Sequence, residues 1–275
     1  MGVECVQTFY TFYHDKESEK IKMNYFWETV ETIESGVGFK HFDVTHISWL
    51  VAFVIFTTVC TCIYRKLPDK KRKIFRYVLA GLIVADELFK MAFLFTTDLY
   101  TPKYLPFHLC SINIFMISLH AMKPFKALDN YLYAIAIPAA LLGLIFPSWV
   151  RLPALNGMHI HSFTVHILLA AYPIVVTLGG DIKPKLKELP KALLVLVCLA
   201  VPVYCINLWL DTNFMFLMNA YPGNPLYIFE QMFGNHLIGI AVLLPLIMIL
   251  MYTPVCILEA VKKRKGNAAE DQKCA

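Results

Sequence analysis

The sequence predicts an all-α, polytopic membrane protein with seven transmembrane helices, its N-terminus outside and its C-terminus in the cytoplasm. Of the 275 residues, 58% are hydrophobic and only 16% are charged, whereas a soluble domain averages about 25% charged residues. Seven spans of about 20 apolar residues each use roughly half of the chain. The rest suffices for short loops and two tails, so a second soluble domain is excluded.

Apolar runs of helical length follow one another along the chain, separated mostly by short loops. The transmembrane domain, 46–258, lies between a polar and interfacial N-terminal segment, 1–45, and a basic cytoplasmic tail, 259–275, that we expect to be disordered. Residues 23–33 are a candidate for a stretch that lies along the membrane surface. The predicted spans cover about residues 46–64, 77–97, 106–122, 129–147, 159–179, 192–210 and 236–258.

The longest loop, from Asp211 to Asn235, is itself aromatic and apolar. Irregular backbone at membrane depth must face protein or water, because lipid offers it no hydrogen-bond partners. We therefore expect this loop to lie in the interface or to fold back onto the protein.

The distribution of Lys and Arg predicts the orientation. With the N-terminus outside, the cytoplasmic segments 65–76, 123–128 and 180–191 hold seven, two and four basic residues, and the tail holds five. The external loops hold only Lys103 and Arg151. Cytoplasmic loops of membrane proteins carry such an excess of positive charge. Six or eight spans would break the alternation, so the bias favours seven.

The net charge of +5 is typical of cytoplasmic loops in a membrane protein and does not predict a nucleic-acid partner. The eight cysteines are scattered, mostly within apolar runs. They form neither a disulfide framework nor a CxxC metal site, and most are expected to pack helices as small apolar residues. We expect neither a metal nor a cofactor.

Cys110 lies at the start of the third predicted span. A cysteine nucleophile needs a stabilised thiolate or a base that removes the thiol proton. A helix N-terminus and a nearby imidazole both meet that need. His108 is two residues away and points nearly the opposite way on a helix, so it is a poor partner unless the start of the span is unwound. A packing cysteine is the alternative.

The fifth span carries three histidines and a serine near its outer end, namely His159, His161, Ser162 and His166. Ser162 and His166 are four residues apart and share a helix face. The histidines are candidates for a general base, for zinc ligands together with His108, or for interfacial residues satisfied by water. A catalytic zinc usually has three protein ligands, and no spacing here is diagnostic of one.

Two further groups of polar residues lie within or beside the spans. Glu87 and Lys90 are three residues apart in the second span and can pair. Intramembrane ionisable residues usually face the bundle interior or a wet cavity, so this pair either fixes helix packing or lines a cavity in which Glu87 orients a histidine or binds a head group. Asn207, Asp211 and Asn213 are candidates for binding an ester or phosphate, or for turn formation after the sixth helix.

Three segments, in order, resemble signature segments of the YwaF/transmembrane protein 164 family. They are LPFHLCSINIF at 105–115, SFTVHILLAAYPIV at 162–175 and NLWLDTNFMFLMNAYPGNPL at 207–226. The spacing fits over roughly residues 39–258 on the same seven-helix plan. The activity attributed to the animal branch of the family is cysteine-dependent acyl transfer between phospholipids, with lyso ether lipids as acceptors.

The resemblance implies that Cys110 is the nucleophile and His166 the matching histidine, although helix depth alone leaves His161 open as the base. Our first hypothesis is an integral-membrane lipid acyltransferase or acyl hydrolase that acts on phospholipid or lysophospholipid. Its partners are membrane lipids, in the plasma membrane of a bacterium or an endomembrane of a eukaryote. The candidate substrate-binding residues are His108, His161, Glu87, Asn207 and Asn213.

Two other hypotheses remain open. The first is a zinc-dependent seven-helix lipid amidase or esterase, in which histidines hold a metal whose bound water is the nucleophile. The second is a non-enzymatic transporter or lipid-binding protein with Glu87 and Lys90 along its path. Metal content and solute flux distinguish these from the cysteine enzyme. The oligomeric state, the acyl donor and the acceptor are left open by the sequence.

Overall fold

The computed structural model describes residues 25–274, with side chains as far as Val261 and at Lys263. All regular secondary structure in this range is helical. The fourth predicted span is built from three consecutive pieces, α5 (Lys126–Tyr131), the π-helical η2 (Leu132–Ala136) and α6 (Ile137–Ile145). The long helices are α2 (Val44–Lys66), α3 (Asp69–Thr96), α4 (Leu109–Met122), α7 (Gly157–Leu178), α8 (Leu189–Leu210) and α10 (Leu237–Cys274).

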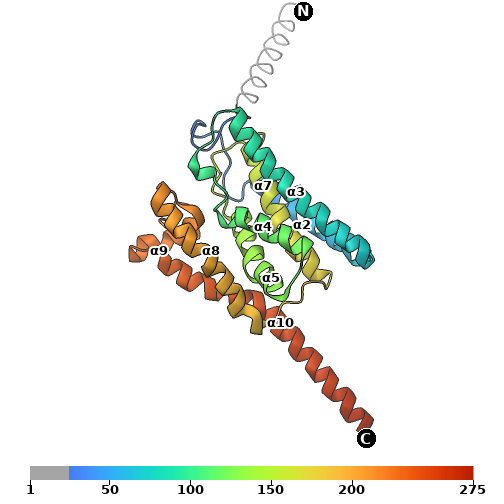
Figure 1. Cartoon of the computed structure of the whole chain (residues 1–275). Helices are drawn as coiled ribbons and strands as arrows, with labels where there is room; N and C mark the ends of the chain where they lie inside the picture. Colours follow the sequence, from blue (N-terminus) through green and yellow to red (C-terminus); the bar gives the residue numbers. More distant parts are fainter. Residues whose placement is uncertain (1–24, 275) are drawn as a thin grey trace, which may run out of the picture.

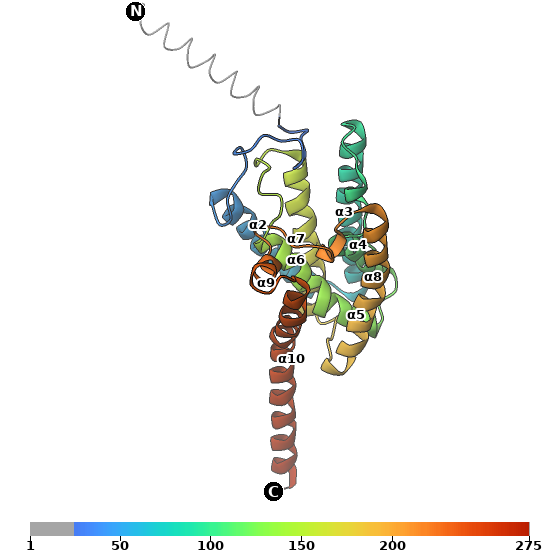
Figure 2. The same cartoon turned by 90° about the vertical axis from the view of Figure 1, so that its left-hand side faces the viewer.

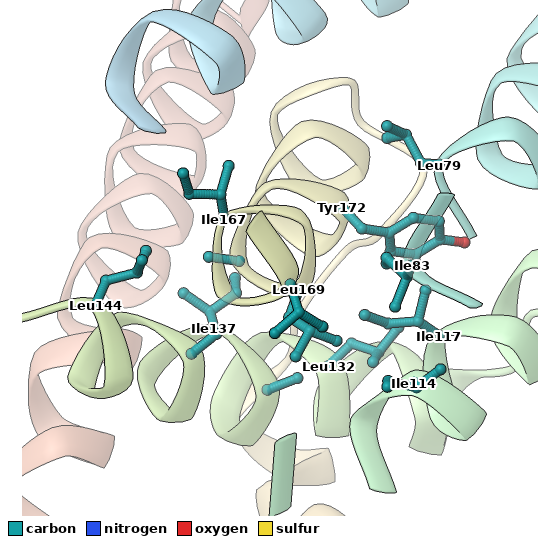
Figure 3. Packing of buried hydrophobic residues seen from close by; sticks show 14 of the residues in the cluster. Leu79, Ile83, Ile114, Ile117, Leu132, Ile137, Leu144, Ile167, Leu169 and Tyr172 are labelled. Atoms are coloured by element: carbon teal, nitrogen blue, oxygen red, sulfur yellow. The ribbon is translucent and has the colours of Figure 1, made fainter. Parts of the chain in front are cut away.

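Helix α7 is the centre of the bundle, packed against α2, α3, α4 and α6. Figure 3 shows its Leu169 and Tyr172 among aliphatic side chains of the neighbouring helices, such as Ile83 of α3 and Ile117 of α4. All four of these side chains are fully buried. Helix α8 lies at the edge of the bundle, and α10 extends beyond its lower end (Figures 1 and 2). The many apolar side chains exposed on α8 and α10 are those expected of a lipid-facing surface.

Six helical segments are long and apolar enough to cross a membrane, judged by length and composition. They correspond to six of the seven predicted spans. The remaining predicted span, which is the second along the chain, corresponds to α3. It is not among the six because Asp86, Glu87 and Lys90 interrupt its apolar run. Helix α3 nevertheless runs antiparallel to α7 along its full length, since Arg76 contacts the loop after α7 while Phe93 packs on Gly157 at the start of α7.

One end of the bundle is closed by residues 25–43. The carbonyl of Phe26 accepts a hydrogen bond from the backbone N–H of Gly157 (3.0 Å), and Phe39 donates its N–H to Val150 (2.9 Å). A Cβ atom at Gly38 would lie 2.0 Å from the Val150 carbonyl oxygen, so only glycine allows this close approach. The described part of the predicted surface stretch 23–33 is therefore held on the α6–α7 loop, while residues 23 and 24 lie outside the described range.

Asp43 caps the start of α2. Its carboxylate accepts hydrogen bonds from the backbone N–H groups of Lys40 and His46, both at 2.9 Å. These two bonds, that from Lys40 first, hold the pKa of Asp43 below its ordinary value. The aspartate is therefore ionised at neutral pH and compensates the positive end of the helix dipole.

The opposite end of the bundle is closed by polar side chains. Asp181, just after α7, accepts from Arg72 (3.0 Å), Arg76 (2.8 Å) and the fully buried hydroxyl of Tyr64 (2.5 Å). This carboxylate joins the ends of α2, α3 and α7. A second network lies nearby, in which His120 of α4 contacts Tyr172 of α7 (2.8 Å) and Asp129 of α5 (3.0 Å).

The π-helical turn follows from the proline in the fourth span. Pro138 has no N–H group, so the carbonyl four residues earlier loses its α-helical partner. The helix adapts by a wider turn over Leu132–Ala136. This turn changes the helical register between Tyr131, on its N-terminal side, and Gly143 on its C-terminal side, and both of these residues lie near the candidate site described below.

The structure differs from the sequence-based expectations in three places. Helix α3 begins at Asp69, eight residues before the predicted span, because the basic segment is itself helical after the Leu67–Pro68 turn. The loop from 211 to 235 contains a short helix, α9 (Pro225–Phe233), which packs on α10. The prediction of a disordered tail is wrong for 259–274, since the backbone of α10 continues to Cys274.

We expect Asp181→Ala to destabilise the protein by roughly 1–3 kcal/mol, because it removes the shared acceptor of two arginines and a buried tyrosine. The measurement is thermal unfolding in detergent. Glu188→Gln is the matched control, because Glu188 pairs only with the 64% exposed side chain of Lys191 and such pairs contribute little. Equal stability of the two variants would contradict a role of Asp181 in joining the helices.

Candidate active site

The side chains of Cys110 and His166 lie in contact. Helix α4 begins after His108, whose backbone is extended (φ −66°, ψ 149°), so Cys110 lies in the first turn of the helix. His166 is in the N-terminal half of α7, and its Nε2 atom is 3.1 Å from the Cys110 Sγ atom. The two residues are 56 positions apart in the sequence and meet because α4 packs on α7.

The second nitrogen of the imidazole decides the role of the first. His166 Nδ1 is 2.6 Å from the backbone carbonyl oxygen of Ser162, one turn earlier in α7. A carbonyl can only accept, so Nδ1 carries the proton and donates it to this bond. In the neutral ring, Nε2 then has a free lone pair directed at the thiol, and it is the atom that can receive the Cys110 proton. The shared face of Ser162 and His166 is confirmed, but the backbone carbonyl rather than the serine hydroxyl makes the contact.

Two residues that the sequence did not single out shape the space around the imidazole. The ring of Trp149 lies 5.0 Å from the ring of His166, with an interplanar angle of 31°. A Cβ atom at Gly143 of α6 would lie 2.5 Å from His166 Cδ2 and 2.7 Å from Nε2. The imidazole thus occupies the volume that any other residue at 143 would need for its side chain.

The first turn of α4 offers unused hydrogen-bond donors beside the sulfur. The backbone N–H groups of Leu109, Cys110 and Ser111 have no acceptor among residues 25–274, as is usual at the start of a helix. Such groups form the positive end of the helix dipole and bind anions. They can stabilise a thiolate at Cys110 or a negative oxygen formed close to it.

His161 belongs to a different group of polar residues. Its Nδ1 atom lies 3.3 Å from a carboxylate oxygen of Asp86, and the other oxygen of Asp86 accepts from the hydroxyl of Thr164 at 2.9 Å. Helix depth alone left both His161 and His166 open as the base. In the structure His166, and not His161, contacts the thiol. Asp86, rather than Glu87, is the acidic residue of α3 that faces a histidine.

Glu87 forms an ion pair with Lys90, as their spacing predicts. Lys90 is only 7% exposed, although it lies in the middle of an apolar helix. A buried charge of this kind is tolerated when it is paired. The pair lies on α3, which packs against both α4 and α7.

His108 and Asn207 both contact the loop that follows α8. The ring of His108 packs edge-on against Phe214 at 5.1 Å. Asn207, 1% exposed, donates to the Phe214 carbonyl (3.0 Å) and accepts from the Phe214 N–H (2.7 Å) and the Thr212 hydroxyl (3.0 Å). The buried amide therefore holds a turn that contains the left-handed residues Asp211 and Met215, and this turn places Phe214 over the start of α4.

Asn213 lies in the same loop, and its side chain is used there. Its amide donates to the carbonyl and side-chain oxygens of Asn219, at 2.9 and 2.5 Å. Its own oxygen accepts from the N–H groups of Met218 and Asn219. The structure thus places the Asn213 amide in the turn and not beside Cys110.

The family of the chain follows from comparison with known proteins. A family model described as the TMEM164 family matches residues 39–252. The chain belongs to the TMEM164 family. Comparisons with the curated proteins and with the solved structures give no match. The match includes all three sequence segments that carry the resemblance, and it includes Cys110 and His166.

Two further histidines of this TMEM164-family chain, His46 and His159, have structural partners. His46 contacts the carbonyl of Leu144 at 2.7 Å, and His159 accepts from the indole N–H of Trp49 at 3.0 Å. Within the described residues, no three or more His, Cys, Asp or Glu side chains come together as a metal-binding group. The three histidines considered as zinc ligands are therefore not gathered into one such group.

We expect Gly143→Ala to reduce the reactivity of Cys110 at neutral pH by about 100-fold or more, because the new methyl group displaces the His166 ring and general bases contribute about 10²–10⁴-fold. The measurement is the rate of Cys110 alkylation, followed by mass spectrometry. Gly81→Ala is the matched control, since no atom lies within 4 Å of its added methyl group. Unchanged alkylation in Gly143→Ala would show that the histidine does not activate the thiol.

Proposed function

We propose that this TMEM164-family membrane protein is a lipid acyltransferase or acyl hydrolase that uses Cys110 as its nucleophile and His166 as its base. The proposal is carried by one observation. The thiol lies 3.1 Å from a histidine nitrogen whose lone pair is free, because the other ring nitrogen is bonded to the Ser162 carbonyl. A nucleophile, a base within hydrogen-bond reach and a third group that orients the base form the arrangement used in covalent catalysis.

The first half-reaction transfers an acyl group to the enzyme. His166 Nε2 takes the thiol proton while the Cys110 sulfur attacks the ester carbonyl carbon of a phospholipid. The carbonyl oxygen becomes negative, and the free N–H groups of the first turn of α4 are near enough to the sulfur to stabilise it. When the carbonyl re-forms, the bond to the glycerol oxygen breaks and the imidazolium returns the proton to that oxygen. The products are a lysolipid and a thioester on Cys110.

The second half-reaction releases the acyl group. The neutral His166 removes the proton from a hydroxyl group of a lysolipid, or from water, as that oxygen attacks the thioester. The sulfur leaves and receives the proton back from the imidazolium. A lysolipid acceptor makes the protein a transferase and water makes it a hydrolase. The aromatic side chains of Phe107 and Phe214 at the start of α4 favour the transferase, because a lipid acceptor partitions into apolar surroundings and water does not.

The loop after α8 has the composition of a cover for the acyl chain. Phe214 is fully buried and packs against Phe107 and His108, immediately before the helix that carries the nucleophile. The short helix α9 of the same loop also exposes apolar side chains, among them Ile228 and Met232. We propose that an acyl chain enters along this loop, with His108 and the ion pair of Glu87 and Lys90 nearer to the polar part of the lipid.

We also propose that α3 crosses the membrane, which brings the number of spans to seven. Its ends align with the two ends of α7, and the three ionisable residues that distinguish it are covered by other helices or paired. Seven spans place the N-terminus outside and the C-terminus in the cytoplasm, in agreement with the positive charge of 65–76. The membrane would be the plasma membrane in a bacterium and an endomembrane in a eukaryote.

Cys110→Ser should abolish acyl transfer while the protein remains folded, because a serine hydroxyl is a far weaker nucleophile than a thiolate beside the same base. The experiment treats purified protein with a lipid-like thiol-reactive probe and maps the modified residue by mass spectrometry. We expect Cys110 to react selectively and Cys205→Ala, a change at an exposed cysteine of α8, to leave labelling and transfer unchanged. Uniform labelling of the cysteines would refute the proposal.

Seven spans predict that the two termini lie on opposite sides of the membrane. In intact cells or sealed vesicles, an epitope tag at the N-terminus should be accessible from outside, whereas one at the C-terminus should need permeabilisation. Two tags accessible from the same side would rule out seven crossings, and with them the assignment of α3 as a span.

A further inference from the structure

Asn113 is a fully buried polar residue that takes no part in the acyl-transfer steps proposed above. It lies in α4, is 0% exposed, and its Oδ1 atom accepts from the hydroxyl of Tyr131 at 2.9 Å. Its Nδ2 atom has no partner among residues 25–274. Buried amide N–H groups are nearly always satisfied in folded proteins, so an unpaired one in a membrane-embedded core calls for an acceptor that arrives with a ligand.

The helix places this amide beside the nucleophile. Asn113 follows Cys110 by three residues, so the two side chains lie on the same face of α4 in successive turns. Side chains of a helix lean towards its N-terminus, and the Asn113 side chain therefore leans back to the turn that carries the sulfur. The free N–H groups of the first helical turn lie one turn before Asn113 in the same helix.

Tyr131 decides which end of the amide is available. It is itself 0% exposed and lies directly before the π-helical turn of the fourth span. Its hydroxyl donates to the carbonyl oxygen of Asn113, which leaves the NH₂ group as the free end. The same fourth span supplies Gly143, against which the His166 ring packs. Tyr131 thus contacts, through Asn113, the part of α4 that carries Cys110, and the Cys110 sulfur contacts His166 of α7.

We propose that Asn113 Nδ2 donates a hydrogen bond to the carbonyl oxygen of the acyl ester that Cys110 attacks, and that Tyr131 is the positioning residue that orients this amide. As the carbon–sulfur bond forms, the electron pair of the carbonyl π bond moves onto the oxygen, and the N–H group stabilises this charge without giving up its proton. On collapse the carbonyl re-forms, the ester oxygen leaves, and His166 supplies the proton to it. This inference rests on the proposed function. It adds a side-chain donor that lies one helical turn after Cys110 in α4.

The test compares two reactions of the same thiol. Acylation of Cys110 by a short-chain p-nitrophenyl ester forms a negative oxygen, whereas alkylation by iodoacetamide does not. For Asn113→Leu we expect acylation to fall by about 100- to 1,000-fold, the loss typical for one donor of this kind, with alkylation changed by less than about threefold. Tyr131→Phe should lower acylation alone, by roughly 10-fold.

Two further variants separate catalysis from folding. Asn113→Leu combined with Tyr131→Phe removes both partners of the buried bond, which is less disruptive than removing one, and it should still lose acylation selectively. Asn130→Leu changes another buried asparagine whose amide is satisfied by the carbonyl of Lys126 at 2.8 Å. It should lower stability but keep the ratio of acylation to alkylation.

The outcomes distinguish this inference from the proposed function. If the wild-type protein forms the acyl thioester and Asn113→Leu forms it equally fast, the role of Asn113 is refuted and the nucleophile stands. Equal loss of acylation and alkylation in the Asn113 variants would make the residue structural and would also refute the inference. If the wild-type protein forms no thioester at Cys110, both proposals fail together.

Discussion

The hydrogen bond between the His166 ring and the Ser162 carbonyl is the interaction on which the candidate site depends. It is short, at 2.6 Å, and it lies within α7, the helix at the centre of the bundle. Because it fixes both the position of the ring proton and the plane of the ring, the opposite nitrogen is directed at Cys110. The other features of the site serve this ring, since Gly143 leaves space for it and Trp149 lies along it.

The position of α7 is fixed in turn at both ends of the bundle. At one end, its first residues bond to the segment 25–43, and at the other the loop after it carries Asp181 with two arginines and a tyrosine. Between these ends the helix is held mostly by apolar packing, as Figure 3 shows for Leu169, with a few polar contacts such as that of Tyr172 to His120. In a membrane, where lipid is as apolar as the core, such polar contacts at the ends fix the register that packing leaves free.

The polar residues in the half of the bundle that contains the start of α7 fall into separate groups with separate roles. His46 and His159 join helices and loops through satisfied hydrogen bonds, and Asn207 holds the turn that places Phe214. Among the described residues, the thiol and its histidine are the only pair of these whose geometry suits proton transfer from a nucleophile to a base. Asp86 with His161, and Glu87 with Lys90, form the polar pairs on the α3 side of the bundle.

The sequence by itself determined the helical membrane class, most of the span boundaries and Cys110 as the candidate nucleophile. It left His161 open as the base beside His166, which the family resemblance favours. Hydropathy, positive charge and helical spacing are local properties, and the apolar solvent enforces them strongly. Only the tertiary structure decided which histidine meets Cys110, because a difference of a few ångströms in depth depends on how α4 packs on α7. The roles of Gly143, Trp149, Asn113 and Tyr131 likewise arise from contacts between distant segments. A glycine or an asparagine in an apolar run shows nothing unusual until the side chain that it must accommodate or bind is brought against it.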